Sequence, residues 1–294
     1  FWDVGAVSIG VDVAGADGGL SGSILSFGSM ASLKIGRNLQ GGIAGASGII
    51  NGPASTNFFI GKLEIGGSMV GNTGERSGSV WTLGTIGTMT VGGSVSSGSG
   101  IASGGIRANE AINSLTITGN VTGASLSSPV FITGGGVDFF TFEREATTAI
   151  GKVVIKGNVT NTRILAGWDA KADQNTPSSH RPAPVNGDAS IGSVEVLGTW
   201  SASDIAAGAV DSTFNGFGRN DALITPNLPG KIAKIGSVSL GTAVGSTVFG
   251  EHFGIVAERL GTIKANGQSF TAGAGSGSGD LDQVNFNFKY LTLA

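Results

Sequence analysis

The side chains best suited to chemistry on this chain are acidic residues that recur at one position of a repeated sequence pattern. Glu64 and Glu195 occupy that position, each between two apolar residues of an expected strand. Hydrolysis of a glycosidic bond uses two carboxyl groups about 5 to 9.5 Å apart. Four repeats separate the two glutamates, which puts them roughly 19 Å apart at ~4.8 Å per stacked strand. We therefore expect no carboxylate pair on this face, and a surface ion pair between Glu64 and Lys34, one repeat earlier.

Three longer stretches between repeats hold much of the chain's aromatic and charged chemistry. They span residues 127–148, 167–190 and 209–234. Binding residues tend to lie on loops that a rigid scaffold carries. The alternative is structural: the aromatic rings cover a flank of the scaffold and the charged groups solvate the loops. The candidate ligand-binding residues are Phe140, Trp168, Asp169, His180, Arg181, Phe217 and Arg219.

An enzymatic role for these stretches would need acidic residues that folding brings together. Asp169 and Asp211 stand in two different stretches and are one such combination. Their sequence spacing does not fix the distance between them. Because the strand face offers no carboxylate pair and this spacing does not establish one, we expect no enzymatic activity and name no catalytic residue.

Metal ligands are sparse in this sequence. The chain has no Cys, and His180 and His252 lie far apart without a spaced carboxylate motif. Transition-metal sites in proteins draw on such ligands at short spacings, so we expect no metal site and no cofactor. The segments Gly275 to Asp282 (GSGSGDLD) and Ala16 to Gly19 (ADGG) resemble parts of calcium-binding repeats, but the nonapeptide pattern never recurs in register. Calcium is a weak alternative.

The elements that would position these residues follow a short repeated pattern, IGxLxI in its clearest form. Of the 30 residues at its three apolar positions, 29 are Val, Ile, Leu, Met or Phe. The second and third positions are separated by one residue, so they share one face of an extended strand. Each copy is therefore predicted to be a β-strand. The copies begin at Val4, Met30, Ile60, Ile86, Ile112, Ile150, Ile191, Ile235, Leu260 and Leu281.

A tight corner is expected after most of these strands. Glycine permits a positive φ or a close backbone approach, and it stands two residues after the last apolar position at Gly67, Gly93, Gly119, Gly157, Gly198 and Gly267. A second apolar-alternating stretch follows the corner, as in VTNTRILAG from Val159 to Gly167. Asn120 and Asn158 match the glycosylation acceptor pattern, but both occupy the same corner, so turn chemistry explains them equally well.

Repeats of this length predict a coil. Copies 21 to 26 residues apart are too close for a strand, a helix and a return, but allow one turn with two or three short strands. We predict an all-β fold, a right-handed parallel β-helix (β-solenoid) of about ten rungs, where a rung is one turn of the coil. The three long stretches fall on rungs 5–7 at one phase of the coil and should form one lateral crown. A single domain over residues 1–294 is expected.

Composition narrows the classes of function. The net charge is −3 and only 13% of the residues are charged, so no basic field attracts nucleic acid or anionic lipid. No apolar run approaches the ~20 residues that span a bilayer. The absence of Cys fits many exported bacterial proteins. Because the chain begins with Phe1 rather than Met, we expect either a removed signal peptide or a piece of a longer chain, and an extracellular location.

The two ends of a solenoid expose unpaired backbone and are normally capped. No amphipathic capping helix is readable here, and the stretch from Val284 to Leu293 alternates like a strand. Three interpretations remain open: a segment of a longer solenoid with flanking repeats, a subunit that stacks end to end with further copies, or a monomer with a modest cap. For stacking, the candidate interface residues are Phe1, Trp2, Val284, Phe286, Phe288, Tyr290 and Leu291.

The phrases IGSVSLGTAV, IGKVVIKGNVTNTRILAG and INSLTITGNVTGASL carry a family resemblance. They resemble the Gly-rich β-strand repeats of very large bacterial surface proteins, the adhesin-like and autotransporter-passenger-like β-helices. The resemblance covers essentially the whole chain and rests on the inward apolar residues and the corner glycines. It implies an extracellular structural or adhesive role and supplies no catalytic residues.

Two functions remain as hypotheses. The first is a structural extracellular protein, a β-solenoid subunit of a bacterial surface filament, stalk or adhesin that assembles by end-to-end β-strand stacking. The alternative is a carbohydrate-binding or polysaccharide-cleaving β-helix that uses the lateral crown. Surface glycans would then be its partners.

Overall fold

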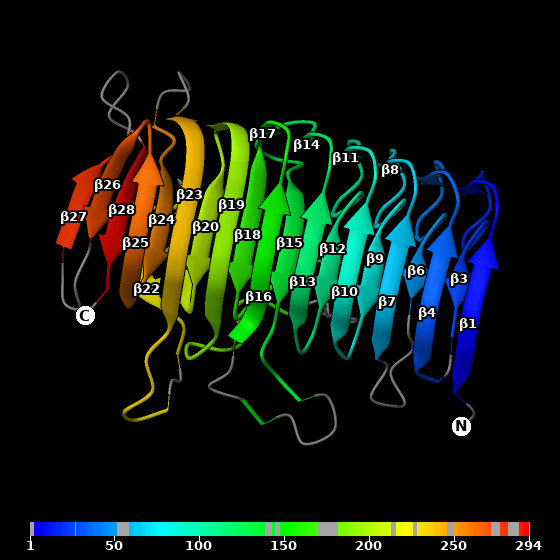
Figure 1. Ribbon diagram of the computed structural model, residues 1–294, viewed down its shortest axis with the longest axis horizontal. Coiled ribbons are helices and arrows are strands. Elements are labelled where there is room, and N and C mark those ends of the chain that lie inside the picture. The colour runs from blue at the N-terminus through cyan, green and yellow to red at the C-terminus, as the bar shows by residue number, and fades with distance from the viewer. Residues whose placement is uncertain are drawn as a thin grey trace.

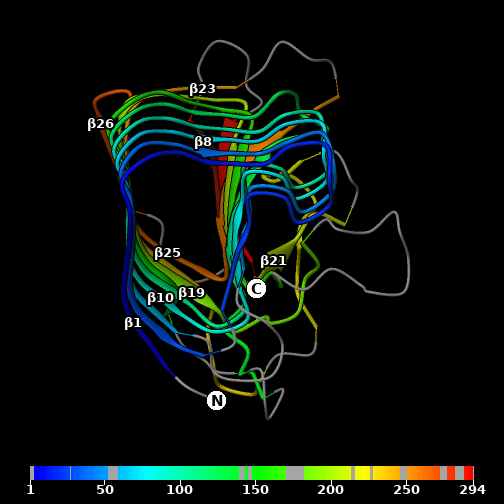
Figure 2. The same cartoon turned by 90° about the vertical axis from the view of Figure 1, so that its right-hand side faces the viewer.

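The computed structural model describes residues 3–26, 28–51, 59–138, 143–144, 148–169, 182–212, 216–225, 228–245, 250–271, 277–281 and 288–293. Within these ranges the regular structure is all β, and no helix is long and apolar enough to cross a membrane. The chain winds into an elongated solenoid with its N-terminal strand at one end (Figure 1). Successive turns superimpose in the view along the solenoid axis (Figure 2).

The strands that open each repeat lie side by side in one long parallel sheet, which we call sheet A. The copies that begin at Val4 through Leu260 are confirmed as strands, each paired in parallel with the next. Of the copy that begins at Leu281, residues 282–286 lie outside the described ranges. These strands are β1 (Val4–Ile9), β4 (Met30–Ile35), β7 (Ile60–Ile65), β10 (Ile86–Val91), β13 (Ile112–Ile117), β16 (Thr148–Ile155), β19 (Ser190–Ser201), β23 (Lys234–Val244) and β25 (Arg259–Ala265).

A row of two-residue strands follows the first corner and belongs to the same sheet. The long strands β19 and β23 run through both rows, because Trp200 of β19 pairs with Val159 on one side and with Ala243 of β23 on the other. The short strands are β2 (Val13–Ala14), β5 (Leu39–Gln40), β8 (Met69–Val70), β11 (Val95–Ser96), β14 (Val121–Thr122) and β17 (Val159–Thr160).

A third strand in each turn builds a second sheet, sheet B, opposite sheet A. The stretch from Val159 to Gly167, expected as one strand, is divided at Asn161, whose φ of 49° turns the chain from β17 into sheet B. The strands of sheet B are β3 (Ile24–Leu25), β6 (Ile50–Asn51), β9 (Val80–Thr82), β12 (Ile106–Ala108), β15 (Val130–Gly134), β18 (Thr162–Ala166), β20 (Asp204–Ala207), β24 (Phe253–Ala257), β28 (Phe288–Thr292) and β27 (Gly277–Asp280).

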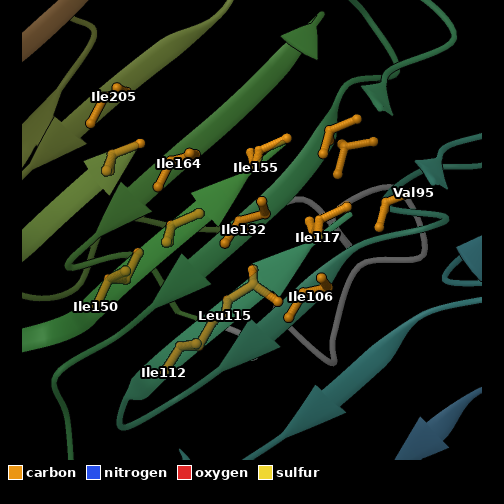
Figure 3. Close-up of a cluster of buried hydrophobic side chains, with 14 of the residues drawn as sticks. Val95, Ile106, Ile112, Leu115, Ile117, Ile132, Ile150, Ile155, Ile164 and Ile205 are labelled. Atoms are coloured by element: carbon orange, nitrogen blue, oxygen red, sulfur yellow. The ribbon is translucent and has the colours of Figure 1, made fainter. Parts of the chain in front are cut away.

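The apolar core runs along the axis between the two sheets. Leu115 of β13 is in register with Met89 of β10 and with Val153 of β16, and all three side chains are buried. Ile106 and Ile132 of sheet B are buried as well, and Figure 3 shows them with Leu115 among the side chains between the two sheets. The alternation read from the sequence therefore assigns the correct face of each strand to the interior.

Polar side chains form a ladder along the first corner. Asn120 Oδ1 accepts a hydrogen bond from the backbone N–H of Asn158 at 2.8 Å, and Asn158 Oδ1 accepts one from Thr199 at 2.9 Å. A Cβ on Gly157 would lie 2.4 Å from Asn120 Oδ1. Close backbone approach therefore requires glycine at position 157. At Gly267, by contrast, the φ is positive, at 73°. The two asparagines therefore join successive rungs at this corner.

The predicted ion pair on the outer face of sheet A is present. Lys34 Nζ lies 2.7 Å from Glu64 Oε1, and Lys62 Nζ lies 3.4 Å from Glu64 Oε2. Both lysines lower the pKa of the Glu64 carboxyl, first through hydrogen bonding from Lys34. Register places Glu64 and Glu195 four strands apart, so this face brings no two of these acids together.

The two ends of the solenoid differ. At the N-terminal end, β1, β2 and β3 are the outermost strands of their rows and are parallel to their neighbours. At the C-terminal end, β26 (Gln268–Thr271) lies antiparallel to β25 and ends sheet A, while β27 lies antiparallel to β28 and ends sheet B. Figure 1 shows these reversed strands at the end opposite β1.

Candidate functional site

The long insertions connect the ends of sheet B strands to the starts of sheet A strands. They follow β15, β18 and β20, so they leave the solenoid at one corner, below the strands in Figure 1. The first was expected from residue 127, but residues 130–134 form β15 instead. The reason is that this strand is buried on both faces and therefore lacks the alternation that marks a half-exposed strand. The insertion begins at residue 135.

The insertions cover the outer face of sheet B with a second apolar core. On the strands, Phe131, Leu165 and Val256 point away from the solenoid interior and are nevertheless buried. Phe217 packs on them from the covering loop, which we define as residues 208–224 apart from 213–215. A small antiparallel pair inside this loop, β21 (Ala209–Val210) with β22 (Ala222–Leu223), fixes its two arms.

Trp168 and Phe217, both candidate ligand-binding residues, contact each other in this second core. Their ring centroids are 6.2 Å apart in an edge-to-face arrangement, and Trp168 Nε1 donates a hydrogen bond to Ala209 O at 3.0 Å. Phe217 is 1% exposed. A ring this deeply buried packs on the scaffold and does not face a ligand, so the structural interpretation of the aromatic residues fits Phe217. Phe140, His180 and Arg181 lie outside the described ranges.

An ion pair lies at the edge of the second core. Arg163 of β18 and Asp204 of β20 are neighbours in register, with Arg163 Nε 3.4 Å from Asp204 Oδ2. Asp204 Oδ1 accepts a hydrogen bond from Gly254 N at 3.1 Å. The carboxyl of Asp204 is 1% exposed. Its burial raises the pKa of Asp204 to about 7, against the lowering effects of Arg163 and of the Gly254 N–H.

Two further aspartates on the covering loop face this ion pair. Asp211 Oδ2 accepts a hydrogen bond from Gly216 N and Asp221 Oδ2 accepts one from Gly218 N, both at 2.7 Å. Burial first, and then the charge of Asp211, raise the pKa of Asp221 to about 7. The charges of Asp221 and Asp211 also raise the pKa of Asp204. The three carboxyl groups therefore form one electrostatic cluster.

The two glycines bring the covering loop against β24. Gly216 has a φ of 90°, and a Cβ there would lie 1.9 Å from His252 O. Gly218 has a φ of 103°, and its backbone approaches Gly254 so closely that a Cβ on Gly254 would lie 2.6 Å from Gly218 Cα. Only glycine allows this approach at either position.

A histidine borders the cluster. His252 Nε2 lies 3.5 Å from Arg219 Nη1, which is on the exposed side of the covering loop, and His252 Nδ1 is buried without a hydrogen-bond partner among the described residues. Burial first, and then the charges of Arg219 and Lys289, lower the pKa of His252. Candidate residue Arg219 thus borders the acidic cluster, with its side chain next to this neutral imidazole.

Asp169 and Asp211, the example of an acid combination, each act on other charged groups of this region. Asp211 acts on Asp204 and Asp221, whereas the charge of Asp169 acts on Arg107. Sequence reasoning missed Asp204, which lies within an apolar strand. One signal was available: Arg163 and Asp204 stand at equivalent positions of successive repeats, so stacking had to make them neighbours.

A second group that the sequence did not reveal lies farther along sheet B. Arg107 of β12 is completely buried, and its guanidinium carbon lies 6.0 Å from the ring centroid of Trp81, its neighbour in register on β9. Arg76 stacks on the same ring at 5.1 Å. Burial, followed by the charge of Arg76, lowers the pKa of Arg107 to about 9, and the charge of Asp169 opposes this. Cation–π contacts of two arginines with one indole ring hold the corner against the sheet.

Stability is expected to fall as the pH rises from about 5 to about 8, through the buried aspartates. The pKa of Asp204 is about 7 in the folded protein against an ordinary value of 3.8. Between these values the folded chain holds a proton that the unfolded chain has lost, so stability is lost as pH rises through the folded pKa. His252, with a lowered pKa, acts in the opposite direction below pH ~6.5.

The Asp204→Asn variant isolates this effect, because Asn resembles the protonated acid and keeps an acceptor for Gly254. We expect denaturant unfolding to show the variant more stable than the wild type by at least about 1 kcal/mol at pH 8, and the difference to shrink at pH 5. Both proteins contain His252, so its contribution cancels when the free energy of unfolding of one protein is subtracted from that of the other. Parallel stability curves for the two proteins across this pH range would contradict the assignment.

The candidate assembly residues lie at the C-terminal end as far as they are described. Tyr290 and Leu291 belong to β28, which pairs with β24 on one side and with β27 on the other, so their backbone is not an open edge. The Tyr290 ring lies 6.1 Å from that of Phe270. Phe288 starts the same strand, and Phe1, Trp2, Val284 and Phe286 lie outside the described ranges.

In the described part of the chain, no group of three or more His, Asp or Glu side chains is placed to hold a metal ion. Of the calcium alternative at Gly275 to Asp282, residues 275, 276 and 282 lie outside that part. Comparison of this chain with models of known protein families, with curated proteins and with solved structures finds no match.

Proposed function

We propose that this chain is a structural protein of the bacterial cell exterior, a rigid segment of a surface filament, stalk or adhesin. In this proposal the coil is right-handed, has about ten rungs and is continued end to end by strand stacking. The observation that carries the proposal is the uninterrupted inward ladder, from Leu33 at one end to Ile263 at the other. A ladder of this kind makes a stiff rod, because each turn is fixed to its neighbours over its whole length.

The outer surfaces support the same function. Sheet A presents a flat row of small polar and paired charged side chains, such as Thr88, Thr116 and the Lys34–Glu64 pair. Sheet B is covered by the insertions, whose aromatic residues Trp168 and Phe217 pack in the second core. These features suit a spacer that holds other groups away from a surface.

Labelling of intact cells of the source organism tests the location and the shape together. Gold-conjugated antibody raised against the purified chain is expected to decorate the outer surface in lines, and electron micrographs should show thin projections there. Permeabilised cells serve as the control for antibody access. Label that appears only after permeabilisation would overturn an exterior structural role.

A second function deserves a test because of the acidic cluster. Asp221 has a pKa of about 7, and an acid that stays protonated near neutral pH can protonate a leaving group. Arg219 on the exposed side could bind an acidic sugar. In this candidate function the crown would bind or cleave a polysaccharide.

Glycan-array binding and a reducing-end assay on acidic and neutral polysaccharides decide between the two functions. The structural proposal expects no binding and no new reducing ends. The polysaccharide hypothesis expects cleavage that the Asp221→Asn variant loses by more than about a hundredfold, while Glu195→Gln, on the far sheet, keeps it. Binding that Trp168→Ala abolishes would favour a lectin role for the crown.

A further inference from the structure

The first turn of the solenoid leaves its apolar ladder uncovered on one side. Val4, Val7 and Ile9 of β1 are only partly buried, whereas the residues in register with them on β4, Met30, Leu33 and Ile35, are 2%, 1% and 0% exposed. Ile24 of β3 is likewise partly buried, and its partner Ile50 is 1% exposed. The difference arises because no described strand stacks on the outer side of β1 and β3.

The edge strand also lacks the features that normally prevent strand pairing. Natural edge strands are blunted by charged side chains, proline or bulges. The sequence of β1 is VGAVSI, with no charge and no proline. Its six residues match the length and pattern of β4, β7, β10 and β13. The edge strand β1 therefore has the features of an internal strand that pairs on both sides.

The corner ladder points to the same neighbour. Asp12 is its first member, and its Oδ1 accepts hydrogen bonds from the N–H and the side-chain amide of Asn38, both at 2.8 Å. In the later turns, the backbone N–H of a ladder residue donates to the residue before it, as Asn120 N donates to Ser94 Oγ. The N–H of Asp12 has no such acceptor among the described residues.

The C-terminal end offers no equivalent surface. There β26 and β27 run antiparallel to the strands beside them, so a rung added in parallel register would meet reversed strands. Ala265 and Leu281, at this end of the ladder, are 1% and 3% exposed, and Phe270 and Tyr290 pack against the same core with their rings 6.1 Å apart. Figure 1 shows β26 and β27 at this end of the solenoid and β1 at the other.

We infer that the N-terminal turn is a docking surface for one further parallel β-solenoid rung. This rung carries apolar residues in register with Val4, Val7 and Ile9 and an Asn, Ser or Asp side chain that accepts the Asp12 N–H. The inference rests on the proposed function and restricts its strand stacking to one end: a parallel rung is added at the β1 end and not at the β26 and β27 end. The contact would repeat the interface that already joins β1 to β4.

A rung taken from the chain itself tests the inference. The segment Ile86–Glu110, placed directly before Asp3, keeps the 26-residue spacing from Val4 to Met30 and brings its copy of Ser94 to the Asp12 N–H. We expect hydrogen exchange of the amides in Val4–Ile9 to slow by at least about tenfold. Trypsin should also spare the copy of Arg107 in the added rung, because the backbone of a paired strand is protected from cleavage while it stays folded.

Two matched variants complete the test. The same rung with Met89→Asp and Val91→Asp in the added copy should leave exchange in β1 unchanged and be cut at its Arg107. The unaltered rung placed after residue 294 should also be cut. Equal protection of the rung at both ends, or no protection at the β1 end, would overturn the inference.

A second copy of the chain is the competing occupant. If the unextended protein protects its own β1 amides as its concentration rises, with a matching increase in mass by light scattering, the docked element is another molecule and the inference is wrong. The labelling of cells tests the proposed function separately. If the added rung docks but the protein is found only inside cells, this inference is supported and the proposed exterior structural role is wrong.

Discussion

Replacing Leu115 by Asp is expected to abolish folding of the solenoid. Leu115 is 0% exposed and stands between Met89 and Val153 in the inward ladder. Loss of a buried Leu side chain costs about 2–5 kcal/mol, and an unpaired buried carboxylate adds several kcal/mol. Together these approach the whole stability of a typical domain, about 5–15 kcal/mol. Circular dichroism and denaturant unfolding of purified protein measure the loss.

Thr116→Asp is the matched control for this substitution. Thr116 is the next residue of the same strand, points outward and lies in register with Thr90 and Val154. A carboxylate there stays in water, so the free energy of unfolding should change by no more than about 0.5–1 kcal/mol. Similar destabilisation by the two variants would contradict the assignment of the faces. Because turns contact only their neighbours, the damage from Leu115→Asp should spread outward from β13.

These two substitutions test the part of the fold that could be predicted from the sequence. The period of two in Ile112, Leu115 and Ile117 marks a strand with one buried face, and its recurrence marks the stacking. Both signals are local, and a repeated local signal is reinforced by each copy. Strand starts, faces and register therefore follow directly from the printed residues.

The third strand of each turn could not be predicted in the same way. Strands such as β15 and β18 are buried on both faces, because insertions cover the outer one, so their residues do not alternate. The bends that begin them use positive φ at residues other than glycine, 49° at Asn161 and 46° at Ala202. Alanine does not indicate such a bend, so the residues before and after it are predicted to form one strand.

The sequence predicted where the insertions lie, but it did not point to Asp204. The insertions do gather at one corner, and Trp168 lies there. The acidic cluster depends on Asp204, which the pattern hides inside a strand, and on covering-loop glycines whose close approach to β24 only the folded backbone reveals. A raised pKa of this kind comes from burial, and no local sequence pattern predicts that an irregular loop will bury a side chain.

Phe217→Ala is expected to release the covering loop while the solenoid stays folded. Phe217 is 1% exposed and packs against Trp168 and the outer side chains of sheet B. Removing a buried Phe side chain costs about 3–5 kcal/mol. The inward ladder does not include this residue. The cost should therefore fall on the loop alone, which has few other apolar anchors, and not on the main unfolding transition.

Hydrogen exchange at two glycine amides reports the release directly. Gly216 N and Gly218 N donate to the carboxylates of Asp211 and Asp221 in the docked loop, so their exchange should accelerate at least about a hundredfold in Phe217→Ala, since each tenfold step corresponds to about 1.4 kcal/mol. Water would then reach Asp204, lower its pKa toward the ordinary range and flatten the fall in stability between pH 5 and 8. Arg219→Ala, on the exposed side of the same loop, should leave the exchange of both amides nearly unchanged. If Phe217→Ala speeds neither amide, the second core does not hold the loop, and the raised pKa of Asp204 needs a different source of burial.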